Sequence, residues 1–239
     1  MSSLPTDLSR TLATLSARYA DQGPETVLRA AIGEDFLGRI ALVSSFGNEA
    51  AVLLALVAEV EPALPIIFLD TGKHFDETLG YRDLLIDRLD LKDVRSVGPE
   101  AGLIERDDRD GLLWRCDPDA CCFTRKVLPL RCALAGFDAW ITGRKRYQGD
   151  VRTDLPTVEA QDGKIKINPL AAWSRDRIQA EFEARDLPRH PLEAEGFLSI
   201  GCAPCTERVA PGADARSGRW AGRAKTECGI HFPVEAAVG

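Results

Sequence analysis

The stretch RIALVSSFGNEAAVLLALVAEV, residues 39–60, contains a short apolar run, a loop of small and polar residues, and a second apolar run. The first run has the length of a buried strand, and the apolar residues of the second cover a helical face. The strand-then-loop pattern returns in LPIIFLDTG (residues 64–72), and DETLGYRDLLIDRL (residues 76–89) supplies the next helix. Two more strand-like runs follow, DVRSVGP (residues 93–99) and FDAWITG (residues 137–143). This alternation predicts an α/β fold whose mostly parallel sheet is covered by helices on both faces.

The length of 239 residues suits one such domain with an appended segment. From about Ala203 the chain is rich in Gly, Ala and Arg and loses its apolar periodicity. We therefore expect an α/β domain over residues 1–205 and a mobile C-terminal tail over residues 206–239.

The net charge of −7 argues against a broad electrostatic grip on nucleic acid or on an anionic membrane. The N-terminal stretch MSSLPTDLSRTLATLSARYA has the pattern of an amphipathic helix rather than a signal peptide. No later segment approaches the roughly 18 apolar residues of a membrane span. We expect a cytoplasmic protein, in a reducing compartment where structural disulfides are rare.

Ligands of parallel α/β sheets bind beyond the carboxyl ends of the strands, so the loops there are candidate binding loops. In SSFGNEAA, Ser44 and Ser45 offer hydroxyls, Gly47 permits a close approach, and the following helix start suits an anionic oxygen. An ordinary strand-to-helix connection explains this loop equally well. In DTGKHF, Asp70 and Thr71 are candidate hydrogen-bonding groups, or caps of the next helix.

The segment TGRKRYQGDVR, residues 142–152, follows the fourth strand-like run and is strongly basic. Its cations are Arg144, Lys145, Arg146 and Arg152. Solvated surface cations are the usual explanation of such a run. Its place after a strand end favours anion binding.

Four of the seven cysteines form two compact groups, Cys121 with Cys122 and Cys202 with Cys205. Such a set suits zinc or an iron–sulfur cluster. Adjacent side chains reach one tetrahedral ion awkwardly, whereas a cluster offers each sulfur its own iron, so the pattern favours [4Fe-4S] over zinc.

The last cysteine, Cys228, follows a segment with four cations and one carboxylate between residues 216 and 228. Nearby cations favour the thiolate, which is the nucleophilic form of cysteine. An ordinary surface cysteine is the alternative reading.

Seven segments in order, SSFGNEAAVLL, LDTGKHFDET, CCFTRK, INPLAAW, SIGCAPCT, RSGRW and ECGIHF, together resemble the assimilatory sulfonucleotide reductases. Within them, the chain is most similar to the bacterial iron–sulfur adenylyl-sulfate reductases. The resemblance runs from about Ala41 to Phe232. It implies an adenine-nucleotide α-hydrolase-like fold and thioredoxin-dependent reduction of adenylyl sulfate to sulfite and AMP, in sulfate assimilation and cysteine biosynthesis. It also brings a tendency to form homo-oligomers.

The resemblance implies a role for each matching residue. Cys228 would be the nucleophile that carries an S-sulfocysteine intermediate, and Lys126, Arg216 and Arg219 would be the cations around the substrate. The implied ligands of a [4Fe-4S] cluster are Cys121, Cys122, Cys202 and Cys205. The expected substrate contacts are Ser44, Ser45, Gly47, Asp70, Thr71, Gly72, Arg125, Gly143 and Arg152.

The sequence departs from the family pattern at Ala50, where the wider pyrophosphatase loop ends in Ser or Asp, and at Lys145 and Gly149. Three rival functions remain open at this point. Reductases of the 3′-phosphorylated nucleotide resemble this chain and share the Cys228 tail, but they lack the four cysteines. A cluster-containing tRNA-thiolating enzyme conflicts with the acidic charge and Ala50, and a non-enzymatic zinc module leaves the arginine-flanked tail unexplained.

Overall fold

The computed structural model describes residues 6–149 and 152–233. Residues 1–5 of the predicted N-terminal helix and residues 234–239 of the predicted tail lie outside this range. The six elements predicted from the first apolar stretches are all present. They are β1 (Ile40–Ser44), α3 (Ala50–Val60), β2 (Ile66–Leu69), α4 (Asp76–Leu89), β3 (Val94–Val97) and β4 (Ala139–Ile141).

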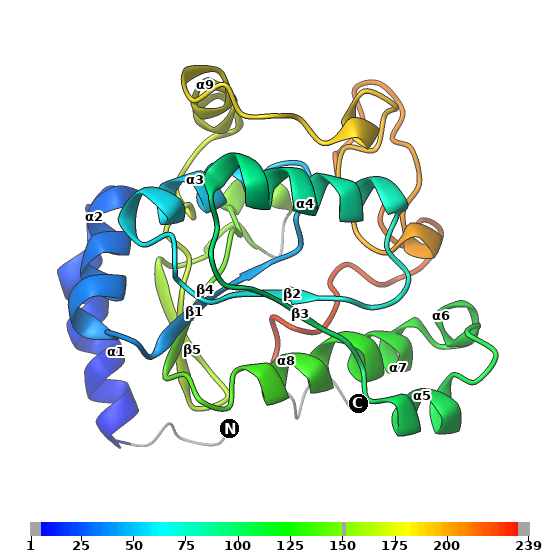
Figure 1. Cartoon of the computed structure of the whole chain (residues 1–239), viewed down its shortest axis with the longest axis horizontal. Coiled ribbons are helices and arrows are strands. Elements are labelled where there is room, and N and C mark those ends of the chain that lie inside the picture. Colours follow the sequence, from blue (N-terminus) through cyan, green and yellow to red (C-terminus); the bar gives the residue numbers. More distant parts are fainter. Residues whose placement is uncertain (1–5, 150–151, 234–239) are drawn as a thin grey trace.

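A six-stranded sheet in the order β3-β2-β1-β4-β6-β5 forms the centre of the molecule (Figure 1). The predicted strands pair in parallel, with Leu42 opposite Ile66 and Ile40 opposite Ala139. At one edge, β6 (Lys164–Ile167) joins β4 in parallel and β5 (Val158–Gln161) pairs with β6 antiparallel. The prediction of a mostly parallel sheet is confirmed.

Side chains alternate along the strands and supply two apolar cores, one on each face. Leu42, Ile66 and Ile141 pack into the larger core with α3, α4 and the N-terminal helices α1 (Thr6–Tyr19) and α2 (Pro24–Ala30). Ala41, Ile67 and Trp140 face the other way, against α8 (Leu128–Ala133). Figure 1 shows α3 and α4 on one side of the sheet and α8 on the other, which confirms the prediction of helices on both faces.

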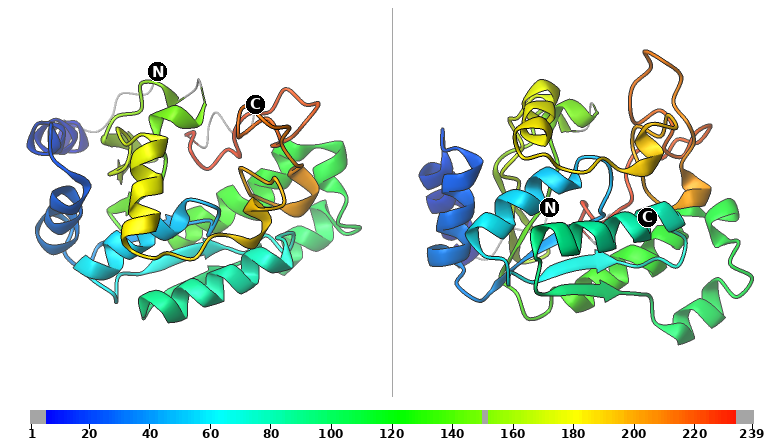
Figure 2. Two further views of the ribbon diagram at one scale, coloured as in Figure 1. Left: turned by 90° about the horizontal axis from the view of Figure 1, so that it is seen from above. Right: turned by 45° about the horizontal axis from the view of Figure 1, so that its top comes forward.

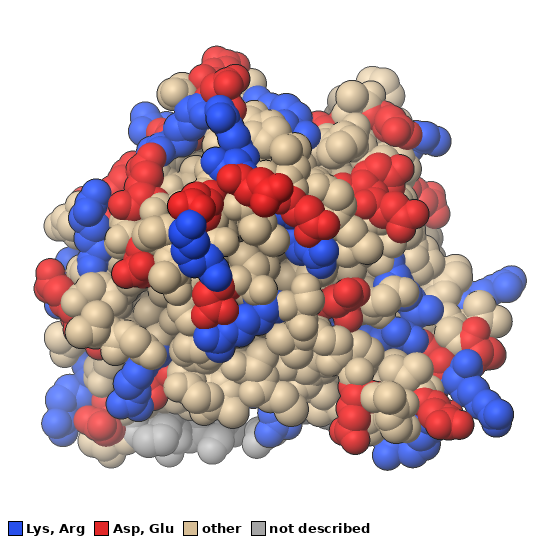
Figure 3. All heavy atoms as spheres, in the orientation of Figure 1, with Lys and Arg blue, Asp and Glu red and all other residues tan. Residues whose placement is uncertain are grey.

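The remaining described helices are short or lie at the periphery. They are α5 (Ala101–Asp107), α6 (Leu113–Cys116), α7 (Pro118–Cys122) and α9 (Arg175–Ala184), with single turns η1 (Ala31–Asp35), η2 (Phe123–Val127), η3 (Arg146–Gln148), η5 (Pro191–Glu193) and η6 (Ala203–Cys205). In the part of the chain that the structure describes, no helix is long and apolar enough to cross a membrane. On the face in Figure 3, acidic and basic side chains are interspersed.

The tail after Cys205 contains no helix or strand up to residue 233, apart from one isolated bridge between Thr206 and Arg219. It nevertheless folds back onto the domain, as its orange and red course in Figure 2 shows. Trp220 N donates to Cys205 O at 3.1 Å, and the Trp220 side chain is buried. This return brings residues near the C-terminus to the ends of the strands.

Candidate active site

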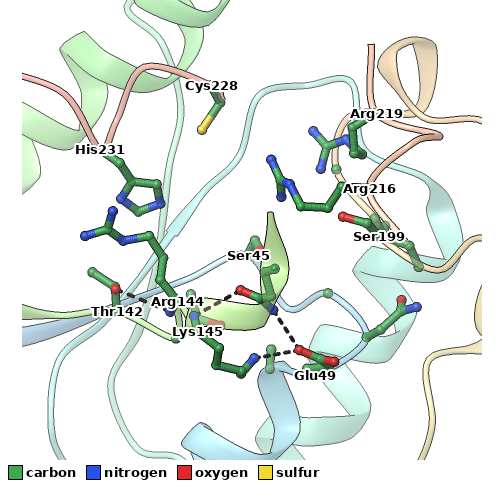
Figure 4. Close-up of a pocket in the computed structure, with 18 of the residues that line it drawn as sticks. Ser45, Glu49, Thr142, Arg144, Lys145, Ser199, Arg216, Arg219, Cys228 and His231 are labelled. Atoms are coloured by element: carbon green, nitrogen blue, oxygen red, sulfur yellow. Dashed lines mark hydrogen bonds and ion pairs between the residues drawn. The ribbon is translucent and has the colours of Figure 1, made fainter. Parts of the chain in front are cut away.

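A cavity of about 250 Å³ opens where β1 and β4 end, and the tail closes its other side (Figure 4). Thr142 and the loop after Ser44 contribute to its wall. Figure 4 shows Cys228, Arg216 and Arg219 approaching the same space from the tail. The predicted site residues that line it are Ser44, Ser45, Gly47, Lys126, Gly143, Arg152, Arg216, Arg219 and Cys228.

The loop after β1 is held in a tight conformation by its own side chains. The Ser44 hydroxyl accepts a hydrogen bond from Phe46 N at 3.2 Å. Phe46 has φ of 48°, a left-handed conformation that is uncommon for a residue other than glycine and often marks a functional site. Its buried ring packs edge-on against Phe68, which supports this conformation.

A carboxylate, Glu49, sits at the start of α3 beside this loop. It accepts hydrogen bonds from Lys145 Nζ, Tyr147 Oη and Gln148 Nε2, each at 2.7 Å. Burial raises the pKa of Glu49, but Lys145 and the other donors outweigh it and hold the pKa below its ordinary value. Glu49 was not predicted as a site residue. Two features of the sequence could have indicated this site: the glutamate that follows GN in SSFGNEAA, and the basic segment GRKRYQ with its glutamine.

Arg219 lies against the backbone of Gly201, where any added Cβ would collide with the guanidinium. Its Cζ also lies 4.5 Å from the centre of the Trp220 ring. Trp220 itself has φ of 50°, so the chain turns sharply at this point. The motifs SIGCAPCT and RSGRW are therefore interdependent, since the glycine of one makes room for the arginine of the other.

Arg152 lines the cavity, but its guanidinium is occupied by protein groups. Arg152 Nε and Nη2 both lie near Glu227 Oε1, at 2.6 and 2.5 Å, and both side chains are buried. Arg152 Nη1 donates to Gln148 Oε1 at 2.7 Å. Arg216 Nη2 donates to Thr226 O at 2.7 Å and lies 3.4 Å from Glu227 Oε2.

His231 stands beside Cys228 at the top of the cavity in Figure 4. Its ring stacks on Trp140, with a centroid separation of 6.0 Å and an angle of 3°. Burial, followed by the nearby cations Lys166 and Arg144, lowers the pKa of His231 well below its ordinary value. The ring is therefore neutral near pH 7. His231 was not predicted as a site residue, although its place three residues after Cys228 in the ECGIHF motif could have indicated it.

A second, much smaller cavity is lined by Cys121, Cys122, Cys202 and Cys205. The first pair ends α7, whose N-cap Asp117 accepts from the backbone nitrogens of Asp119 and Ala120. In the second pair, Cys202 is the N-cap of η6 and Cys205 is its last residue. The two groups, about 80 residues apart in sequence, therefore meet, and all seven cysteines are free of disulfides.

Four predicted substrate contacts do not line the large cavity, although all lie in the described part of the chain. Thr71 Oγ1 lies 3.3 Å from Cys202 Sγ, and Asp70 Oδ1 accepts from Gly72 N at 3.0 Å. Arg125 lines the cysteine cavity and donates to Asp108 and to Thr71 O, each at 2.7 Å. Thr71 and Arg125 thus contact each other and the segments that carry the cysteines. Asp70 and Gly72 stabilise the turn after β2 through their own hydrogen bond.

The donors around the small cavity suit a metal–sulfur group. Across residues 6–149 and 152–233, no three His, Cys, Asp or Glu side chains converge to hold a single ion. All four cysteines line this cavity, and cysteine thiolates are the ligands that hold iron–sulfur clusters. The indole Nε1 of Trp220, which also lines this cavity, is buried without a hydrogen-bond partner. A group with acceptor sulfurs would satisfy it.

Lys126 and Trp220 line both cavities. Burial lowers the pKa of Lys126, but the thiols of Cys202, Cys122 and Cys228 in their charged form outweigh it and raise the pKa above its ordinary value. Lys126 therefore carries a charge between the four cysteines and Cys228.

Residues 39–208 match the model of the phosphoadenosine phosphosulfate reductase domain. The chain belongs to this family. A relative from Mesorhizobium japonicum, named adenosine 5′-phosphosulfate reductase, is 51% identical over 220 residues, covering 92% of this chain and 87% of its own. A relative from Gloeobacter violaceus, named phosphoadenosine 5′-phosphosulfate reductase, is 42% identical over 226 residues, covering 92% and 93%. Members of the reductase family with both names are thus similar to this chain.

The solved structure of a phosphoadenylyl-sulfate reductase from Candida auris has the same fold. It is 24% identical, has a TM-score of 0.71, and is matched over 87% of this chain and 99% of its own. The family and the adenine-nucleotide α-hydrolase-like fold predicted from the motifs are confirmed.

Proposed function

We propose that this chain reduces adenylyl sulfate to sulfite and AMP, with Cys228 as the nucleophile. The observation that carries the proposal is that Cys228 lies in one cavity with Lys126, Arg216 and Arg219, at the ends of β1 and β4. Parallel α/β sheets bind their ligands at this edge. Family membership and the name of the Mesorhizobium relative support the same chemistry.

In the first step the Cys228 thiolate attacks the sulfur of adenylyl sulfate. A bond forms between Sγ and the substrate sulfur, the anhydride S–O bond breaks, and AMP leaves with the electron pair. The product is S-sulfocysteine. In the second step a dithiol, which we take to be thioredoxin, attacks Sγ and releases sulfite. Its second thiol then resolves the mixed disulfide, so the dithiol supplies both electrons and Cys228 returns as a thiol.

Fixed cations would lower the barrier of the first step, because charge develops on the sulfonyl oxygens and on the leaving phosphate. Lys126, Arg216 and Arg219 line the same cavity as Cys228, and Figure 4 shows both arginines reaching into it from the tail. Arg219 is held in place by Gly201 and Trp220 and needs little rearrangement to act. Losing one such preorganised donor typically costs about 3 kcal/mol of transition-state stabilisation.

We further propose that Cys121, Cys122, Cys202 and Cys205 hold a [4Fe-4S] cluster. Support comes from four sulfurs around one small cavity and from the unpartnered Trp220 indole beside them. When bound, the cluster would supply structural support and fixed charge. Lys126, which lines both cavities, would interact electrostatically with the cluster on one side and with the substrate sulfate on the other.

Iron analysis tests the cluster separately from the activity. Protein purified without oxygen should be brown and contain about four irons per chain. Cys205→Ser should lower the iron content, whereas Cys132→Ser, at an exposed cysteine, should not. Colourless protein with one zinc per chain would contradict the cluster.

A serine in place of Cys228 tests the nucleophile. Cys228→Ser should abolish sulfite formation from adenylyl sulfate and thioredoxin while AMP still binds, because a hydroxyl is not ionised near neutral pH. Cys132→Ser is the matched control and should keep wild-type activity. Sulfite formation by the Cys228→Ser variant would refute the assignment.

Comparing the two nucleotides tests the substrate. The alternative is the 3′-phosphorylated nucleotide, which the name of the Gloeobacter relative favours. We expect kcat/KM to be greater for adenylyl sulfate, and a preference for the 3′-phosphorylated form would select the alternative. A reducing cytoplasm, where thioredoxin is available, is the expected setting, and assembly into a homo-oligomer remains a proposal from the family resemblance.

A further inference from the structure

The tail is attached to the domain on both sides of Cys228. One attachment is at Glu227, directly before the cysteine, and the other is at Ile230 and Phe232, directly after it. Between them, Gly229 has φ of 86°, a left-handed conformation that favours glycine. Cys228 thus lies at a turn between two attachment points.

The first attachment is the buried ion pair between Glu227 and Arg152. Two guanidinium nitrogens of Arg152 lie within 2.6 Å of Glu227 Oε1. The third donates to Gln148, which donates in turn to Glu49 at the start of α3. The residue before Cys228 is therefore tied to the loop of the nucleotide cavity through three side-chain contacts.

The second attachment is the side chain of Gln161, the last residue of β5. Its Nε2 donates to Ile230 O and to Phe232 O, both at 2.9 Å. Its Oε1 accepts from Lys166 Nζ at 2.7 Å. Lys166 is fully buried, with Nζ 4.9 Å from the centre of the Trp140 ring, so the amide orientation of Gln161 is fixed.

Gln161 does not line the large cavity, so its contacts with the tail can be separated from nucleotide binding. Arg152 does line it, but its three guanidinium nitrogens contact Glu227 and Gln148 in this closed arrangement. Gln161 can therefore affect the reaction through the tail backbone, and Arg152 through Glu227.

We propose that Gln161 and Arg152 are positioning residues that clamp the tail on either side of Cys228 and so hold its thiol in the cavity. The part that concerns catalysis rests on the proposed role of Cys228. The clamp consists of a few hydrogen bonds and one ion pair, so it can release the tail when the modified cysteine must meet an external dithiol.

The sharpest test is Gln161→Glu. The new carboxylate keeps an acceptor for Lys166 but has no donor for the carbonyls of Ile230 and Phe232, and it repels them. Gln179→Glu, on the exposed face of α9, makes the same charge change away from the tail and is the matched control. Glu227→Gln loosens the other attachment and guards against a folding defect specific to one variant.

The main readout is the rate at which iodoacetamide alkylates Cys228 in the iron-loaded protein, divided by the rate at exposed Cys132 in the same molecule. Loss of two hydrogen bonds should raise this ratio by roughly tenfold in Gln161→Glu. Glu227→Gln should also raise it, and Gln179→Glu should not. In Gln161→Glu, kcat should fall while the affinity for AMP stays at the wild-type value.

An unchanged alkylation ratio in both Gln161→Glu and Glu227→Gln would overturn the clamp. Loss of AMP affinity in Gln161→Glu would also overturn it, because that result would assign Gln161 to nucleotide binding. The alkylation ratio does not depend on turnover. If Cys228→Ser still produced sulfite, the proposed function would fail while this ratio would still decide on the clamp.

Discussion

At the scale of single residues, the lack of a side chain at Gly201 leaves space for the guanidinium of Arg219. A methyl group there would occupy the space of the Arg219 guanidinium. Because arginine is flexible, Gly201→Ala should fold and displace Arg219 from the cavity. We expect kcat/KM for adenylyl sulfate to fall by about a hundredfold, the usual effect of losing one preorganised donor.

Gly136→Ala is the control for this prediction, since a Cβ at Gly136 meets no atom within 4 Å. It should keep wild-type kinetics. Equal kinetics in Gly201→Ala and Gly136→Ala would show that Arg219 does not act from its position against Gly201.

Residue types and motif order were enough to predict which residues line the large cavity in nine cases, from Ser44 to Cys228. They were not enough for Thr71 and Arg125, because direction in a turn depends on packing. Arg125 turns toward buried Asp108, 17 residues earlier in the chain, and Thr71 toward Cys202. No local pattern around Thr71 or Arg125 indicates which of these partners it meets.

At the scale of elements, the β5–β6 hairpin is the part of the sheet that the sequence analysis did not predict. Its turn is Asp162-Gly163, with φ of 50° and 77°, which is the strongest short-range hairpin signal. The flanking segments VEAQ and KIKI are short and half polar, so periodicity alone did not reveal them. Strands β1, β2 and β4 were predictable because their apolar runs are buried on both faces.

His190 connects α4 to η5 and gives a prediction about pH. Its Nδ1 accepts from Leu192 N at 3.2 Å, and its Nε2 lies 3.1 Å from Thr78 Oγ1. Burial lowers the pKa of His190 to about 4, whereas an unfolded histidine has a pKa of about 6.5. The unfolded chain therefore binds a proton first as pH falls, and stability is lost between about pH 6.5 and 4.

We expect the titration of His190 to lower the free energy of unfolding by about 2 kcal/mol when the pH falls from 7 to 5. His190→Asn, which keeps an acceptor for Leu192 N, should lack that part of the pH dependence. Urea unfolding of both proteins at the two pH values measures it. Parallel pH dependence in the two proteins would show that His190 titrates normally in the fold.

At the scale of the whole molecule, the fold brings two cavities into contact through Lys126 and Trp220. The tail completes the arrangement, because Cys228 enters the large cavity while the segment before it covers the cysteines. The chain of contacts from Glu49 through Gln148 and Arg152 to Glu227 joins three distant segments. The contact between Arg152 and Glu227 was not predictable from one sequence, since it depends on how the tail returns.

The most direct test of the central claim is a single turnover without reductant. The iron-loaded protein is mixed with adenylyl sulfate, AMP is quantified, and each cysteine-containing peptide is examined by mass spectrometry. We predict about one AMP per chain and S-sulfocysteine at Cys228 alone, from which thioredoxin releases sulfite. Formation of AMP only after thioredoxin is added, or S-sulfocysteine at another position, would contradict the account.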